Sequence, residues 1–441
     1  MAEPGLAGMA EILKRGLDRA MKKGATAAKI ACWRNGSIAC EFENARLKTA
    51  DTRRSLGYSI DVIAGGLKGS TSGNDPADLD DLIDRAVALS AVGSVAHFSD
   101  YPAPGRTVGV RTHSSMTLEL TRDRIIGECT KIADALKARD PGMFICASGG
   151  RNESEGLLVT TGGVSHSWRS TGWSLGGYVQ RIRGTDMASV GEWRWWGDLN
   201  ELFDPGYILD KIITDLDRCE RIVESPSGLV PVILPPARVE MMLYPVLMGA
   251  SGRNVAKGDS PLKGKLGEKL FDSVLTMVDD PHIDFSGGAS EIDSDGVPTT
   301  KFDIVHDGVL KAFLYDLDSA GLAGAAPTGH DDCWPHMLTV TPGTKSRTEL
   351  FSGVKDGLYV KDLIGFGQSN MMNGDVSGNV SLGFRIKNGE ITGRVKDTMI
   401  AGNVYQLLKQ GVEFSREIDP ISRMPYMKLE GVSVSSGKNP A

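Results

Sequence analysis

The sequence predicts an α+β protein of two domains, residues 1–225 and 226–441. Helical and alternating apolar patterns succeed one another in the first half, which is typical of helices packed on an antiparallel sheet. The turn-forming stretch Pro226–Gly228 then precedes VPVILP, a strand bounded by prolines, so we expect a linker there. The second half is rich in strand patterns, and the chain holds 54 glycines without a repeat period, which favours a twisted β domain.

In the first domain, four segments place apolar residues at helical spacing and are predicted helices: Met9–Lys23, Pro76–Ala91, Leu118–Arg139 and Ile208–Val223. Tyr101–Arg111 is rich in proline and glycine and is predicted to be a connector. Strands are predicted from eight alternating runs: AAKIACW, SIACEFENARLKTAD, SLGYSIDVIAGGLKG, MFICASGG, EGLLVTTGG, VSHSWRST, WSLGGYVQRIRG and GEWRWWGD. The last five predict an antiparallel sheet with one buried face.

The second domain opens with the VPVILP strand. Arg238–Gly258 follows, and its apolar residues are spaced as in a buried helix that runs into a glycine-rich turn. Two hairpins are predicted further on, at Asp307-Gly308 and at Asn388-Gly389. These dipeptides favour the left-handed backbone of a tight hairpin turn. The remaining segments are predicted to be short strands joined by glycine-rich turns.

Composition excludes several classes of protein. The 441 residues carry a formal net charge of -7, which argues against a general nucleic-acid-binding surface. No apolar run reaches the roughly 18 to 20 residues that would span a bilayer. The start of the chain is an amphipathic pattern and not a basic segment followed by an apolar one, so we expect a cytoplasmic protein that binds neither membrane nor nucleic acid. The six cysteines lack CxxC spacing and are expected to be reduced and mostly buried.

Several blocks of the second half occur in an order that resembles one family. They are RVEMMLYPVLMGASGRNVAKG with GDSPLKGKLGEKL, then DDPHIDFSGGASEIDSDGVPTTKFDIVHDGVLKAFLYD, the TGH that ends at His330, GLYVKDLIGFGQSNMMNGDVSGNVSLGFRIKNGEI, and IAGN. This order is similar to that of the TldD/PmbA family, and looser similarity extends into the first half. TldD-type members carry a zinc-peptidase motif HExxxH where this chain has Leu243, Tyr244 and Met248.

Zinc binds imidazole, thiolate or carboxylate ligands at about 2.0 to 2.3 Å, and a hydrolytic site also needs a base. Leu243 and Tyr244 provide neither function, and the thioether of Met248 is a soft ligand poorly matched to hydrolytic zinc. The resemblance also implies a later cysteine ligand, and this chain has no cysteine after Cys333. We therefore expect a degenerate metal motif, no catalytic residue and no cofactor in this chain.

The resemblance implies a PmbA/TldE-type subunit that pairs with a zinc-bearing TldD-type partner in a heterodimer, or forms a homodimer when alone. Such a complex would cleave unfolded or short peptides, bound as an added strand, in peptide maturation or degradation. We take Asn254, His330, Asp331 and His336 as candidates for contacts with peptide or partner. His330, Cys333 and His336 also form an HxxCxxH cluster with zinc-compatible donors, although it has no distant fourth ligand.

Two other hypotheses remain open. Gly172–Gly176 reads GWSLG and matches the GxSxG pattern of serine hydrolases, in which Ser174 would be the nucleophile of a stand-alone enzyme. The residues that follow alternate as in a strand, so we favour a serine within a sheet. Trp193 and Trp195, two positions apart, are predicted to fill one face of that sheet. The other hypothesis is a homodimeric peptide-binding protein without catalytic activity.

Overall fold

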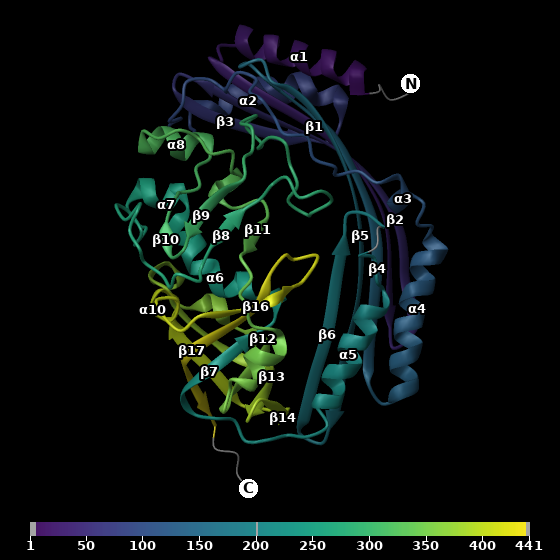
Figure 1. Cartoon of the computed structure of the whole chain (residues 1–441). Helices are drawn as coiled ribbons and strands as arrows, with labels where there is room; N and C mark the ends of the chain where they lie inside the picture. The colour runs from purple at the N-terminus through teal and green to yellow at the C-terminus, as the bar shows by residue number, and fades with distance from the viewer. Residues whose placement is uncertain (1–5, 200–201, 438–441) are drawn as a thin grey trace.

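The structure is a computed structural model that describes residues 6–199 and 202–437. Figure 1 shows two lobes: a long curved sheet carrying helices on its outer side, and a second lobe of smaller sheets and short helices facing its inner side. The protein is therefore of mixed α+β architecture, as predicted. No helix among the described residues is long and apolar enough to cross a membrane.

The first lobe is built on a six-stranded antiparallel sheet in the order β3-β2-β1-β4-β5-β6. Helices α1, α2 and α4 pack on its outer face. The strands are β1 (Ala27–Glu43), β2 (Arg46–Ala64), β3 (Leu67–Gly73), β4 (Phe144–Thr160), β5 (Ser165–Arg183) and β6 (Asp186–Trp196). The helices are α1 (Leu6–Lys22), α2 (Leu79–Ser90), α3 (Ser115–Leu118), α4 (Arg122–Arg139) and α5 (Gly206–Arg218), with a 3-10 turn η1 (Pro76–Asp78) before α2.

The strands are longer than predicted, because glycines expected to end them lie inside them. Gly36 pairs with Arg54 and Glu153 in the middle of β1, so the predicted break there is wrong. The run SIACEFENARLKTAD, predicted as one strand, instead contains the turn between β1 and β2, where Asn44 and Ala45 have positive φ. A ladder of hydrogen bonds on both sides of a central strand outweighs the low strand preference of single glycines.

Two helix boundaries also differ from the prediction. The segment Leu118–Arg139 divides into α3 and α4, because Thr121 caps α4 by accepting a hydrogen bond from the backbone N–H of Arg124. The helix predicted over Ile208–Val223 ends earlier, at Arg218. Tyr101–Arg111 contains no helix or strand, as expected of a connector.

The second lobe contains two sheets. In the larger, β12-β7-β17-β15-β13-β14, an additional pairing of β12 with β13 closes five strands into a ring. The smaller has the order β10-β9-β8-β11. The strands are β7 (Gly228–Leu234), β8 (Met277–Asp279), β9 (Phe302–His306), β10 (Val309–Leu310), β11 (Leu338–Val340), β12 (Asp356–Ile364), β13 (Asp375–Lys387), β14 (Glu390–Arg394), β15 (Thr398–Asn403), β16 (Glu413–Ile418) and β17 (Pro425–Ser436). The helices are α6 (Pro236–Ala250), α7 (Gly252–Lys257), α8 (Leu317–Ala323), α9 (Arg347–Ser352) and α10 (Val404–Leu407).

Both predicted hairpins are confirmed. Asp307 and Gly308 join β9 to β10, and Asn388 and Gly389 join β13 to β14. All four residues have positive φ, between 48° and 84°, as the mirror-image hairpin turns require.

The apolar core does not stop at the predicted domain boundary. One buried cluster contains Trp173 and Leu175 of β5 together with Tyr359 and Phe384 of the second lobe. The strands of the six-stranded sheet nevertheless all lie within residues 27–196, and those of the other two sheets within 228–436. The domain boundary near residue 225 stays a prediction, because the two lobes share part of one apolar core.

Candidate functional site at helix α6 and the interlobe cavity

Helix α6 occupies the segment where the sequence predicts a buried helix. Val239, Met242, Val246 and Leu247 are each at most 1% exposed and belong to the core of the second lobe. Pro245 lies inside the helix, and its carbonyl accepts a hydrogen bond from the Tyr405 hydroxyl at 2.8 Å. After α7, Gly258 takes a left-handed conformation with φ 90°, which is the predicted glycine-rich turn.

The three positions of the degenerate motif have different environments. Leu243 is fully buried in the core. Tyr244 is 41% exposed, and the centroid of its ring lies 4.6 Å from that of the Trp334 ring. Met248 is half-buried, and its carbonyl accepts a hydrogen bond from the Asn254 side-chain amide at 2.8 Å. Asn254 thereby joins α6 to α7, and this part of the helix is held by packing and a local hydrogen bond.

These residues do not fit a zinc ion. Leu243 has no donor atom, the Tyr244 ring is engaged with Trp334, and a thioether alone is a poor ligand for hydrolytic zinc. No group of three or more His, Cys, Asp or Glu side chains within residues 6–199 and 202–437 is arranged to hold a metal ion. We therefore derive no step through a metal bound to this chain.

His330 of the HxxCxxH cluster lies in the interior. It is fully buried, with Nε2 2.9 Å from a carboxylate oxygen of Asp279 and Nδ1 2.8 Å from the Thr328 hydroxyl. The second oxygen of Asp279 accepts the backbone N–H of Met337 at 2.7 Å. His330 has no surface in this structure that a peptide could contact, and its bonds attach the TGH turn to strand β8.

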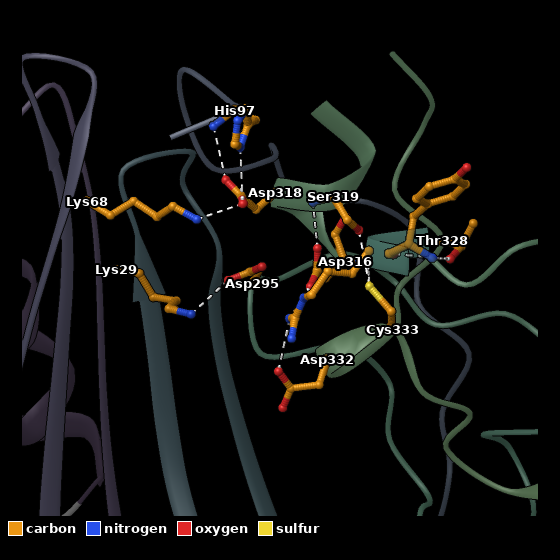
Figure 2. Close-up of polar contacts among 12 residues, drawn as sticks. Lys29, Lys68, His97, Asp295, Asp316, Asp318, Ser319, Thr328, Asp332 and Cys333 are labelled. Atoms are coloured by element: carbon orange, nitrogen blue, oxygen red, sulfur yellow. Dashed lines mark hydrogen bonds and ion pairs between the residues drawn. The ribbon is translucent and has the colours of Figure 1, made fainter. Parts of the chain in front are cut away.

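The other members of the cluster have separate partners. Asp331 is exposed and accepts a backbone N–H from residue Ser294 at 2.7 Å. His336 donates through Nε2 to the Gly329 carbonyl at 2.7 Å. Cys333 is buried, with its sulfur 3.1 Å from the Ser319 hydroxyl (Figure 2). The zinc-compatible donors are therefore tied to different groups, and contact of Asp331 or His336 with peptide or partner stays a prediction.

A set of ion pairs, which we call the polar latch, joins the upper end of the six-stranded sheet to the second lobe (Figure 2). Lys29 of β1 pairs with Asp295 at 2.7 Å. Lys68 of β3 pairs with Asp318 of α8 at 2.7 Å, and the backbone N–H of His97 donates to the same carboxylate at 3.0 Å. The latch holds the loop that carries Asp295 against the inner face of the sheet.

Asp293 lies in the turn beside the latch and is 3% exposed. One of its carboxylate oxygens accepts the backbone N–H groups of Asp295 and Val297, both at 2.9 Å. Burial, followed by the nearby charge of Asp295, raises the pKa of Asp293 to about 7. The protonation of this carboxyl group therefore changes near neutral pH.

The inner face of the six-stranded sheet bears tryptophans whose rings cover glycines. A Cβ added to Gly156 would lie 2.1 Å from the Trp168 ring, and one added to Gly172 would lie 2.6 Å from the Trp195 ring. Trp193 covers Gly176 on the same face, because the strand register places residues 193 and 195 opposite 176 and 174. The prediction that Trp193 and Trp195 share one face of a sheet is confirmed.

Between this face and the second lobe lies a cavity of about 650 Å³, which we call the interlobe cavity. Its floor is formed by β4, β5 and β6, and its wall by residues 286–291 of the second lobe. The lining includes Asn152, His166, Trp168, Arg169, Trp195 and Glu291. This site could not be predicted from local patterns, because residues 152–195 and 286–291 are far apart in the chain and meet only in the fold. The recurrence of tryptophan near strand glycines was the local signal for it.

Ser174 does not lie in a nucleophile elbow. It is in the middle of β5, paired with Gly150 on one side and Trp195 on the other, and its hydroxyl lies 3.4 Å from the Gly150 carbonyl. A nucleophile elbow requires a sharp turn between a strand and a helix. The strand location favoured for Ser174 is confirmed.

Comparison with known proteins gives the family. The family model described as PmbA/TldA metallopeptidase C-terminal domain matches residues 227–436, and that of PmbA/TldA metallopeptidase domain 1 matches residues 37–90. The chain belongs to the PmbA/TldD metallopeptidase family. The structure is similar to that of TldE from Thermococcus kodakarensis, with a TM-score of 0.87 and 24% identity over 96% of this chain and all of that one, which supports the fold.

Curated relatives of the PmbA/TldD family differ in how much of the chain they match. Metalloprotease PmbA of Escherichia coli O157:H7 is 24% identical over 92% of both chains. A metalloprotease of Methanothermobacter thermautotrophicus is 33% identical over 193 residues, 42% of each chain. The chain thus spans about half the length or less of the relatives that it matches at higher identity. The match over nearly the whole length is to PmbA, and this chain is a PmbA/TldE-type member of the family.

Proposed function

We propose that this chain is a metal-free subunit of a peptide-cleaving PmbA/TldD-type complex, in which a TldD-type partner carries the zinc. The observation that carries the proposal is the state of helix α6. At the positions where the resemblance expects ligands and base, Leu243 is packed into the core and Tyr244 is packed against Trp334. The reaction class, peptide cleavage, is inferred from the family. The packing of α6 is the reason that we place the metal on another chain.

In this proposal the chain binds and encloses the peptide. The inner face of the six-stranded sheet offers indole rings and small polar side chains, and the interlobe cavity opens between that face and the second lobe. A cavity of several hundred Å³ with mixed polar and apolar lining is of the size that ligand sites have. Peptide held there would stay close to a partner chain that docks on the same opening.

A homodimeric peptide-binding protein remains the second candidate, since the same cavity serves it equally well. A serine hydrolase based on Ser174 is disfavoured, because a serine in a strand flanked on both sides lacks the geometry of an activated nucleophile.

Co-expression tests the proposal. This chain and a TldD-type relative that carries HExxxH are expressed singly and together, separated by size-exclusion chromatography and assayed on an unfolded peptide. We expect a one-to-one complex that cleaves the peptide, and no cleavage by this chain alone. Peptide cleavage by this chain alone, or cleavage by the partner that is unaffected by this chain, would contradict the proposal. A stable homodimer that binds peptide and ignores the TldD-type chain would favour the second candidate.

A further inference from the structure

Glu291 stands out among the residues that line the interlobe cavity. It comes from the wall of the cavity and is half-buried. No Lys, Arg or His side chain among the described residues lies within the 4.0 Å ion-pair distance of its carboxylate. Arg169, the basic residue of the lining, is directed to Glu155 on β4, at 3.8 Å. The cavity thus contains a partly desolvated negative charge without a positive partner.

His166 does not supply that partner. It lines the same cavity, and its burial lowers its pKa, an effect that the Glu291 charge only partly opposes. The imidazole is therefore mostly neutral at neutral pH. The charge of Glu291 stays available to a ligand.

An indole ring lines the same cavity as this carboxylate. Ile292, the residue after Glu291, packs in the same small apolar cluster as Trp168. The Trp168 ring covers Gly156, which has no side chain, and Trp168 also lines the cavity. A cavity that offers both a carboxylate and an aromatic ring can bind a cation, through charge and through the quadrupole of the ring.

We propose that the interlobe cavity is a binding subsite for a cationic group of a peptide, held by the Glu291 carboxylate and the face of Trp168. The inference rests on the proposed function for the nature of the ligand as a peptide. It adds a preference for positive charge, whose source is either a lysine or arginine side chain or the ammonium group of a peptide N-terminus. The backbone of the same peptide would lie along the inner face, where the Asn152 amide offers a donor and an acceptor.

The test uses the full chain alone and measures binding by calorimetry and tryptophan fluorescence. The probes are three alanine pentapeptides with amidated C-termini: one acetylated with a central lysine, one acetylated with a central norleucine, and one with a free N-terminus and a central norleucine. We expect the lysine peptide, the free-amine peptide or both to bind about tenfold more tightly than the acetylated norleucine peptide. Tighter binding of the lysine peptide would identify a side chain as the source of the positive charge, and tighter binding of the free-amine peptide would identify the N-terminus.

Matched variants locate the site. Glu291→Gln is expected to remove the preference for positive charge, whereas Glu153→Gln, a carboxylate on β4 that lies over Gly36 and outside the cavity lining, is expected to leave it. Trp168→Leu is expected to weaken binding and to reduce the fluorescence change. Trp193→Leu changes a tryptophan that also covers a glycine but does not line the cavity, and it is expected to do neither.

Equal binding of all three peptides, binding of none, or an effect of Glu153→Gln as large as that of Glu291→Gln would overturn the inference. These outcomes are distinct from failure of the proposed function. Binding needs neither partner nor cleavage, so a chain that fails to assemble can still select a cationic peptide, and an active complex can lack this preference.

Discussion

Leu243 and Tyr244 are neighbours in the chain but have different environments. At these two positions of the degenerate motif, one side chain packs in the core and the other is partly exposed to solvent. A leucine that is fully buried contributes through packing and the removal of apolar surface from water. A tyrosine that is 41% exposed and packed on one aromatic ring contributes much less. If these positions act by packing, the two side chains should differ in their contribution to stability.

Truncation of each side chain tests this reading. Leu243→Ala should lower the free energy of unfolding by about 2–5 kcal/mol, because it leaves a cavity in the core. Tyr244→Ala should lower it by about 1 kcal/mol, since it loses one aromatic contact. Urea unfolding followed by circular dichroism measures both. A tolerated Leu243→Ala would show that position 243 is not held by the core.

The sequence identifies the degenerate motif from its spacing, but it does not give the location of His330. The HxxCxxH pattern indicates which donor residues are close in the chain, but it does not indicate where their side chains point. The partner of His330 is Asp279, 51 positions earlier, on strand β8. A pairing of that kind depends on how two segments pack, so reasoning from local spacing placed a buried residue among the candidates for a cleft.

At the scale of elements, alternating apolar residues and turn-forming dipeptides predict whether most segments are helix, strand or turn. They do not predict where each helix or strand ends. The Asp307-Gly308 and Asn388-Gly389 turns follow from left-handed backbone preferences, which belong to two residues alone. The length of β1 does not follow in this way, because Gly36 is kept in the strand by its pairing with β2 and β4 on either side.

The turn that carries Asp293 gives a prediction of pH dependence. The folded state raises the pKa of this carboxyl above the value of an unfolded aspartate, so between about pH 4 and 7 the folded state binds more protons than the unfolded one. The contribution of this group to stability is fully present at low pH and is lost as the pH rises through about 7. Asp293→Asn keeps an oxygen acceptor for the two backbone amides and removes the charge.

Urea unfolding between pH 4.5 and 8 measures the effect. We expect Asp293→Asn to be close to neutral at pH 4.5 and to stabilise the protein by on the order of 2 kcal/mol at pH 8. Asp332→Asn removes an exposed carboxylate of the same lobe and serves as the control, in which the stabilisation at pH 8 should be absent. A variant of Asp293 that destabilises more at pH 8 than at pH 4.5 would contradict the assignment.

At the scale of the molecule, the two lobes are joined by the polar latch above and by a shared apolar core below, with the interlobe cavity between them. The sequence predicts two domains and a family, yet the cavity arises only when residues 152–195 and 286–291 meet. In the proposed function, this chain holds a peptide in the cavity between the lobes, and a second chain carries the metal.

Metal analysis of the separated chains distinguishes zinc bound by the partner from zinc bound by this chain. This chain is purified alone and from its complex with a TldD-type relative, dialysed against zinc, and measured for bound metal by mass spectrometry. We predict one zinc per complex, retained by the partner after separation, and no tightly bound zinc on this chain. One equivalent of zinc held tightly by this chain, with loss on His330→Ala or Cys333→Ala and with peptide cleavage lost in parallel, would contradict the account.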